Sequence, residues 1–348
     1  MTQPEGRRGD DTEDVLKDRT KAGERTGSAS AGGPGRASGD GPAGEGPGSK
    51  ATQGEAGSVR EPTALGPLSG GRSPLFYAQH AGRYQRQQLI RDYQEDHDCR
   101  LIVMIGPIFS YSVIYFEELL FDALPETDLH LMLSSPGGDG EVAVRLVRAA
   151  QARCKRLTVI VPDQAKSAAT LLCLGAHEIL MGPTSDLGPV DPQFPFGDYD
   201  LVSAKDIIAA VERALNDVAD RPDTYALHSA MLSEVNALKV EQARSALART
   251  DDLVREALQS NPDRNRQETE DLVKALHEPL IEAPKDHAAI LGAQYAAELG
   301  LPVRTCDPAS HQWRQIWQLW MHYFALGSAV VYENERASQV EVQEEEVS

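Results

Sequence analysis

Four short apolar segments, each separated from the next by a helical pattern, most constrain the fold of this chain. They occupy residues 101–105, 129–133, 157–161 and 178–181. Such short continuous apolar runs, bounded by turn residues or charges, are typical of strands buried on both faces. Strands that alternate with helices imply right-handed βαβ units and a mainly parallel sheet. The predicted fold class is therefore α/β.

Before the first predicted strand and after the last one, the folded part of the chain shows mainly helical periodicity. It predicts a helix over residues 78–95 before the first strand, helices over 205–218, 225–258, 268–276, 290–299 and 313–332, and a short extended piece over 301–303. The sheet is thus expected to carry a helical C-terminal elaboration.

The first part of the chain has a different composition. Of the 29 glycines, 17 precede Arg72, and they are mixed with Ser, Pro and charged residues. Such a segment buries too little apolar surface to offset the entropy of ordering. We expect a disordered arm over residues 1–72 and a folded domain over 73–310, with its helical elaboration at 203–280. Residues 311–348 are expected to form an aromatic helix and an acidic tail.

Charge and cysteine content exclude several functions. The net charge of −19 disfavours a nucleic-acid surface, which needs clustered Lys and Arg. The four cysteines lie far apart without a C-x-x-C pair, so we expect buried, reduced thiols and neither a metal site nor a cofactor. A signal peptide or an apolar run of about 20 residues is not found, so a cytoplasmic protein is expected. The sequence leaves peripheral membrane association open.

Two turns follow predicted strands and carry the residues of a candidate catalytic site. One turn contains Gly137 and Gly138, and the other leads through Ser167 into the small residues Ala168 and Ala169. Sites in parallel sheets form at the carboxyl ends of strands. Ser167 can act as a nucleophile, with the backbone N–H groups of Gly138 and Ala168 as an oxyanion hole. The alternative is that Ser167 only caps the following helix.

The ordered motifs around these turns resemble a known family. They are Ser-Pro-Gly-Gly after a strand, Ala-Lys-Ser-Ala-Ala-Thr-Leu, Leu-Gly-Ala-His-Glu-Ile-Leu-Met and Leu-Gly-Pro-Val-Asp-Pro-Gln, with further similarity at residues 83–90 and 297–303. This set, over about residues 74–305, resembles the serine dehydrogenase proteinase family, Clp-fold serine proteases related to signal peptide peptidase A. The resemblance implies a Clp/crotonase-like ββα spiral, a nucleophile at Ser167 and an oxyanion hole at Gly138 and Ala168.

The general base is less evident from the sequence. Clp-type proteases carry a His about 25 residues after the serine, and here that region contains Asp191 and no His. A desolvated lysine can replace it, and Lys205 at the start of the next helix is the candidate base. His287 is the alternative base, because imidazole is suited to proton transfer. Asp191 is a candidate site-lining residue, or else a turn residue before Pro192.

Three functions follow from these features. The first is a serine endopeptidase that acts on peptides or proteins through an acyl-enzyme. The second is a non-catalytic Clp-fold scaffold or assembly module, motivated by the absent His. The third is a crotonase-type acyl-CoA enzyme, which is disfavoured because no basic pocket for a nucleotide phosphate is evident. Relatives of this fold assemble through flanking helices, so the resemblance also implies a homo-oligomer, which light scattering would test.

Overall fold

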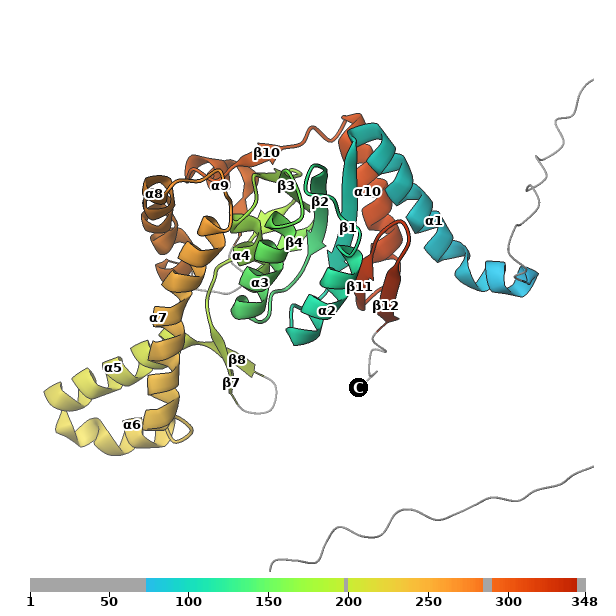
Figure 1. The fold of residues 1–348 in the computed structure, drawn as a ribbon. Helices are drawn as coiled ribbons and strands as arrows, with labels where there is room; N and C mark the ends of the chain where they lie inside the picture. The colour runs from blue at the N-terminus through green and yellow to red at the C-terminus, as the bar shows by residue number, and fades with distance from the viewer. Residues whose placement is uncertain (1–72, 197–199, 284–289, 343–348) are drawn as a thin grey trace, which may run out of the picture. The chain divides into compact units, whose positions relative to one another are not determined.

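A seven-stranded, mostly parallel sheet forms the centre of the chain, as the alternation of strands and helices predicts. The computed structural model describes residues 73–196, 200–283 and 290–342 (Figure 1). The chain divides into two units, Met1–Gly66 and Pro67–Ser348, and every described residue belongs to the second. The sheet order is β10-β5-β3-β2-β1-β11-β12, and all pairs are parallel except the last two. The strands are β1 (Cys99–Ile105), β2 (Asp128–Ser134), β3 (Leu157–Val161), β5 (Glu178–Met181), β10 (Val303–Thr305), β11 (Ala329–Glu333) and β12 (Ser338–Val342).

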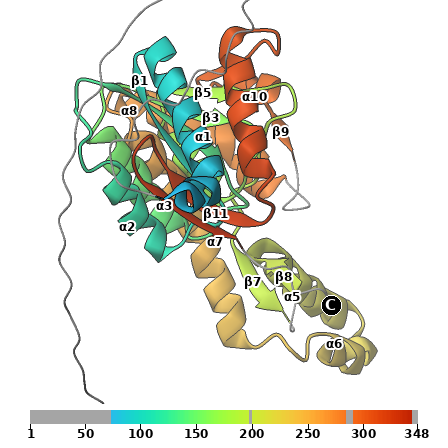
Figure 2. The same cartoon turned by 90° about the vertical axis from the view of Figure 1, so that its right-hand side faces the viewer.

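Helices cover both faces of this sheet. The side chains of β1 alternate: Leu101 and Val103 pack in one cluster with residues of α1 and α10, whereas Ile102 and Met104 pack in the other with residues of α2, α3 and α4. Figure 2 shows α1 and α10 side by side in front of the strands. This double burial explains why the strands read as continuous apolar runs. The helices are α1 (Pro74–His97), α2 (Ser110–Leu119), α3 (Gly140–Gln151), α4 (Ala168–Leu174) and α10 (His311–Phe324).

The long helix predicted over residues 225–258 is divided in the structure. It forms α6 (Tyr225–Met231) and α7 (Ala237–Gln259). The break arises because Asn236 caps a new helix, and its side chain accepts a hydrogen bond from the Lys239 N–H at 2.8 Å. The helices α5 (Ala204–Asp220) and α7 bury a small cluster of their own, and Figure 1 shows α5, α6 and α7 beside the hairpin of β7 (Gln193–Phe196) and β8 (Asp200–Ser203).

The C-terminal part also differs from the prediction of one helix over 313–332. The helix α10 ends at Phe324, Gly327 adopts a φ of +71°, and the chain turns back as β11 into the main sheet. A buried ion pair fixes β11, because Arg86 Nε lies 2.7 Å from Glu333 Oε2, which also accepts a hydrogen bond from the Tyr323 hydroxyl. Part of the predicted acidic tail forms β12, and the remainder lies outside the described residues.

A second, three-stranded sheet lies next to the candidate site. It consists of β4 (Gln164–Ala165), β6 (Asp186–Leu187) and β9 (Leu291–Gly292) in the order β4-β6-β9. The helix predicted over residues 290–299 is therefore shorter, because β9 precedes α9 (Ala293–Glu298). The remaining helical elements are α8 (Arg266–His277), the 3₁₀ turn η1 (Pro222–Thr224) and the π-helical turn η2 (Glu278–Glu282).

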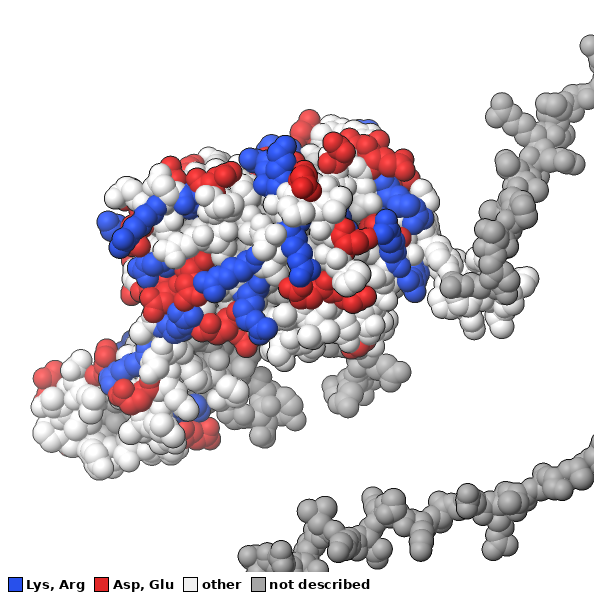
Figure 3. Space-filling view, in the orientation of Figure 1, with Lys and Arg blue, Asp and Glu red and all other residues white. Residues whose placement is uncertain are grey.

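Charges of both signs mix on the face of the molecule in Figure 3. Lys and Arg side chains alternate there with Asp and Glu over α3 and α7. Arg249 pairs with Glu141 and Glu256, and Arg148 also pairs with Glu256. This face therefore offers no single-sign surface of the kind that binds nucleic-acid phosphates.

The prediction that the cysteines are buried thiols is confirmed. All four cysteines are free and buried, and burial raises the pKa of Cys99 and of Cys154 to about 12. Within residues 73–196, 200–283 and 290–342, no helix combines the length and the apolar character that crossing a bilayer requires.

Candidate active site

Ser167 occupies a strained position between β4 and α4. Its backbone has φ 50° and ψ −115°, and among the described residues only Asp98 shares a positive φ without being glycine. Such a conformation costs about 1–3 kcal/mol for a residue with a side chain. Ser167 stands at the cap position of α4, yet its side chain accepts no capping hydrogen bond. A capping role therefore does not account for this serine.

Contacts of Thr170 and Gly188 hold the turn that carries Ser167. The Thr170 hydroxyl contacts both the Ala165 and Gly188 carbonyl oxygens, at 2.8 and 2.9 Å, and so ties the start of α4 to β4 and to the residue after β6. Gly188 packs directly on Lys166, since a Cβ there would lie 2.2 Å from Lys166 Cδ. The turn is thus fixed from both sides.

The Lys166 side chain, adjacent in sequence to Ser167, makes an ion pair. Its Nζ lies 2.6 Å from Asp186 Oδ1 in β6, and both side chains are largely buried. Burial and the nearby Asp186 carboxylate together raise the pKa of Asp163. Lys166 thereby joins β4 to β6 immediately before Ser167.

The Gly137–Gly138 turn packs against Ser167. The Ile108 N–H donates to Gly137 O and the Asp139 N–H donates to Ile108 O, both at 2.8 Å. Both glycines have positive φ, 109° and 139°. A Cβ on Gly137 would lie 2.7 Å from Ser167 Cβ, so only glycine permits this approach.

Two backbone N–H groups next to Ser167 are available to a ligand. Among the described residues, neither the Gly138 N–H nor the Ala168 N–H donates a hydrogen bond to another protein group. The Ala168 nitrogen would lie 3.4 Å from a Cβ on Gly137, which brings it next to the glycine turn. Free donors beside a serine hydroxyl can stabilise the negative charge of a tetrahedral intermediate.

Gly138 provides a direct test of this turn. A Cβ at Gly138 would lie 2.1 Å from Ile108 O, on a backbone with φ 139°. We expect Gly138→Ala to lower the free energy of unfolding by about 2–4 kcal/mol and kcat by about 10²-fold or more, because it moves one N–H of the predicted oxyanion hole. Urea unfolding and peptide hydrolysis measure the two effects. Gly82→Ala in α1 is the control, since its Cβ meets only Arg86 Nη1 at 3.8 Å; equal behaviour of the two variants would contradict the prediction.

Lys205 and Asp191 are connected through one serine. Ser203 caps α5, and its hydroxyl accepts from the Lys205 N–H at 3.2 Å and donates to the buried Asp191 carboxylate at 2.9 Å. The Lys205 side chain is half-buried, and its Nζ donates to the Ile281 carbonyl oxygen at 3.3 Å. Asp191 thus fixes the start of the helix that carries Lys205.

The segment after Gly188 links this lysine to Ser167. The Ser167 N–H donates to Pro189 O at 3.1 Å, and the Val190 N–H donates to Leu280 O at 2.9 Å. The carbonyl that accepts Lys205 Nζ belongs to the residue after Leu280. Residues 189–190 therefore lie between the Ser167 turn and the backbone that binds the lysine amine.

His287 lies outside the described residues, in the gap 284–289. Sequence reasoning missed two residues that build the site, Thr170 and Ser203. A signal existed for Ser203, because Ser-Ala-Lys-Asp is a helix start with a capping serine and an early acidic residue. The only sequence signal that Thr170 helps to hold the Ser167 turn is its position in the motif Ala-Lys-Ser-Ala-Ala-Thr.

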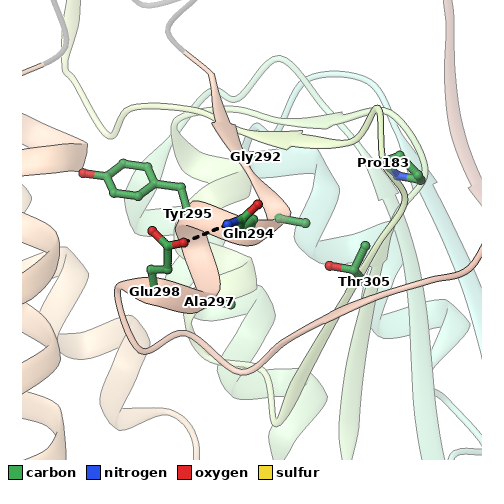
Figure 4. A pocket seen from close by; sticks show the side chains of 8 residues that line it. Pro183, Gly292, Gln294, Tyr295, Ala297, Glu298 and Thr305 are labelled. Atoms are coloured by element: carbon green, nitrogen blue, oxygen red, sulfur yellow. Dashed lines mark hydrogen bonds between the residues drawn. The ribbon is translucent and has the colours of Figure 1, made fainter.

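The described surface contains a hollow of about 930 Å³, and none of the candidate site residues lines it (Figure 4). Tyr295, Gln294 and Glu298 of α9 line it, together with Thr305 of β10. Gln294 Nε2 donates to Glu298 Oε1 at 3.0 Å, so the main polar groups of its wall bind each other. The lining contains no serine or cysteine nucleophile.

Known proteins are similar to this chain in sequence or in structure. The uncharacterized protein MJ0137 of Methanocaldococcus jannaschii is 28% identical over 271 residues, which are 70% of this chain and 86% of that protein. The uncharacterized protein MJ1495 of the same organism is 29% identical over 163 residues, 42% of this chain and only 54% of its own length. A mutant of the 1510-N membrane-bound stomatin-specific protease superposes with a TM-score of 0.37 at 15% identity, over 66% of this chain and 84% of that chain.

A family match covers most of the described structure. The family of ClpP-like SDH-type serine proteinases matches residues 76–325, which include both turns and Lys205. This agrees with the ββα arrangement of strands and helices around Ser167. The chain therefore belongs to the ClpP-like SDH-type serine proteinase family.

Proposed function

We propose that this chain is a serine endopeptidase that cleaves peptides or proteins through an acyl-enzyme on Ser167. Lys205 is the general base, and the N–H groups of Gly138 and Ala168 form the oxyanion hole. The observation that carries the proposal is the strained Ser167, which makes no capping bond and lies beside two free donors. Strain of this kind persists where the surroundings enforce it, and it clusters at catalytic residues.

In the acylation step, the uncharged Lys205 amine accepts the proton of the Ser167 hydroxyl. The Ser167 oxygen forms a bond to the scissile carbonyl carbon, and the carbonyl oxygen becomes an oxyanion held by Gly138 and Ala168. The carbon–nitrogen bond then breaks as the lysine ammonium returns its proton to the leaving amine. The product is a Ser167 ester and a free amine.

In the deacylation step, Lys205 accepts a proton from water. The hydroxide attacks the ester carbonyl, and the same two N–H groups stabilise the second oxyanion. Collapse of this intermediate breaks the ester bond, and the proton returns to Ser167. One base and one oxyanion hole therefore suffice for both steps.

Asp191 is proposed as a positioning residue. It accepts from Ser203 Oγ, and that oxygen in turn accepts from the Lys205 N–H, so the carboxylate acts through the first turn of α5. His287 stays a prediction as the alternative base, and homo-oligomeric assembly stays a prediction as well.

A fluorophosphonate probe tests the proposed nucleophile. The full chain is incubated with the probe, and mass spectrometry locates the adduct; we expect it on Ser167 and expect none in Ser167→Ala. Ser310→Ala is the matched control, because Ser310 is a true cap that accepts from the Trp313 N–H at 3.2 Å. That variant should keep its labelling. Labelling that persists in Ser167→Ala, or no labelling of the wild type, would overturn the proposal and favour a non-catalytic scaffold.

A further inference from the structure

A hollow of about 520 Å³ opens beside the first turns of α10. Its apolar walls are the indoles of Trp313 and Trp317 and the rings of Pro183 and Pro308. None of the residues assigned above to catalysis lines it. We name it the tryptophan hollow.

The two indoles form a preorganised surface. Their ring centroids lie 6.5 Å apart with planes inclined by 27°. Trp313 is only 6% exposed and rests on Gly182, where a Cβ would lie 2.1 Å from the ring. Trp317 is 41% exposed and stacks on it. A rigid aromatic surface of this kind binds a ligand at little entropic cost.

The polar side chains around the hollow, Thr184, Arg314 and Gln318, all carry hydrogen-bond donors. Arg314 and Gln318 are exposed at its edge, and the lining includes no Asp or Glu. Within the described part of the chain, the Arg314 guanidinium makes neither an ion pair nor a hydrogen bond. The hollow therefore suits a ligand that presents apolar ring faces, carbonyl acceptors and a negative charge.

One class of peptide combines these properties. A polyproline II segment has no internal hydrogen bonds, so all its carbonyl oxygens need donors, and its proline rings supply the apolar faces. An α-helix satisfies its own carbonyls, and a β-strand needs a backbone edge rather than side-chain donors. We propose that the tryptophan hollow binds a proline-rich segment of a partner protein in the polyproline II conformation, with an acidic residue beside the prolines that pairs with Arg314.

Binding of a synthetic peptide tests this site. The probe is a dye-labelled oligoproline that ends in glutamates, titrated with the full chain and followed by fluorescence anisotropy. We expect Trp317→Ala to weaken binding by about 10-fold or more. Phe324→Ala is the matched control, because Phe324 lies on the same helix, is 67% exposed and does not line the hollow. This control should bind as the wild type does.

Arg314 gives a second measurement. In Arg314→Gln, the advantage of the glutamate-bearing peptide over uncharged oligoproline should disappear. Equal binding of a Gly/Ser peptide with the same glutamates, unchanged binding by Trp317→Ala, or no anisotropy change with the wild type would overturn the proposal. The site does not depend on Ser167, so Ser167→Ala should bind the probe normally even if the proposed peptidase activity proves wrong.

Discussion

Replacing Ser167 by alanine is expected to lower kcat for peptide hydrolysis by at least about 10⁴-fold, because the acyl-enzyme cannot form. The remaining rate would come from binding and from the oxyanion donors alone. Hydrolysis of a fluorogenic peptide by the full chain measures this loss. A variant that kept more than about a tenth of the wild-type rate would contradict the role of Ser167 as nucleophile.

The stability of Ser167 variants separates chemistry from strain. Alanine keeps a Cβ in the unfavourable conformation with φ 50°, so Ser167→Ala should unfold at nearly the wild-type urea concentration. Ser167→Gly removes the Cβ and should raise the free energy of unfolding by about 1 kcal/mol, although glycine also gains freedom in the unfolded chain. Both variants should be equally inactive. A destabilised Ser167→Gly would mean that the backbone conformation is relaxed rather than strained.

This strain has a structural origin. Thr170 and Lys166 fasten the two sides of the turn, and Gly137 packs against Ser167 Cβ. These contacts leave the serine no room to adopt an ordinary helix-cap conformation. The surrounding contacts thereby compensate for a conformation that points the hydroxyl away from capping and leaves the Ala168 N–H free. If Ser167 acts as proposed, stability is exchanged here for a preorganised site.

The sequence predicted the parts of the fold that depend on local patterns. Continuous apolar runs predicted β1, β2, β3 and β5, because a strand buried on both faces has no polar position. The antiparallel strand β11 was missed and read as helix. Its place in the sheet depends on the pairing of Glu333 with Arg86, 247 residues apart, which no local pattern shows.

In the candidate site too, features set by local sequence could be predicted, and contacts between distant residues could not. The two turns could be predicted, since Gly pairs and a serine among small residues mark backbone that must approach closely. The environment of Lys205 could not, because its Nζ binds a carbonyl 76 residues away. The sequence left open whether Asp191 lines the site or only ends a turn for the same reason: its partner Ser203 is brought to it by the return of the chain through β7 and β8.

Lys205 is expected to be the most informative position after Ser167. Lys205→Met should lower kcat by about 10²- to 10⁴-fold, because the variant lacks the amine that accepts the Ser167 proton in the proposed mechanism. Lys205→Arg should be as inactive, since a guanidinium keeps the charge and the donor to Ile281 O but does not release its proton. A purely structural or electrostatic role would instead be rescued by arginine.

Two controls make the Lys205 result specific. Lys274→Met changes an exposed lysine of α8 in the same way and should keep full activity. The rate of fluorophosphonate labelling at Ser167 should fall in Lys205→Met and Lys205→Arg in parallel with kcat, because both reactions need the activated hydroxyl. If Lys205→Met keeps its activity and its labelling rate while His287→Ala loses both, the base is the histidine and Lys205 only anchors α5 to the backbone at Ile281.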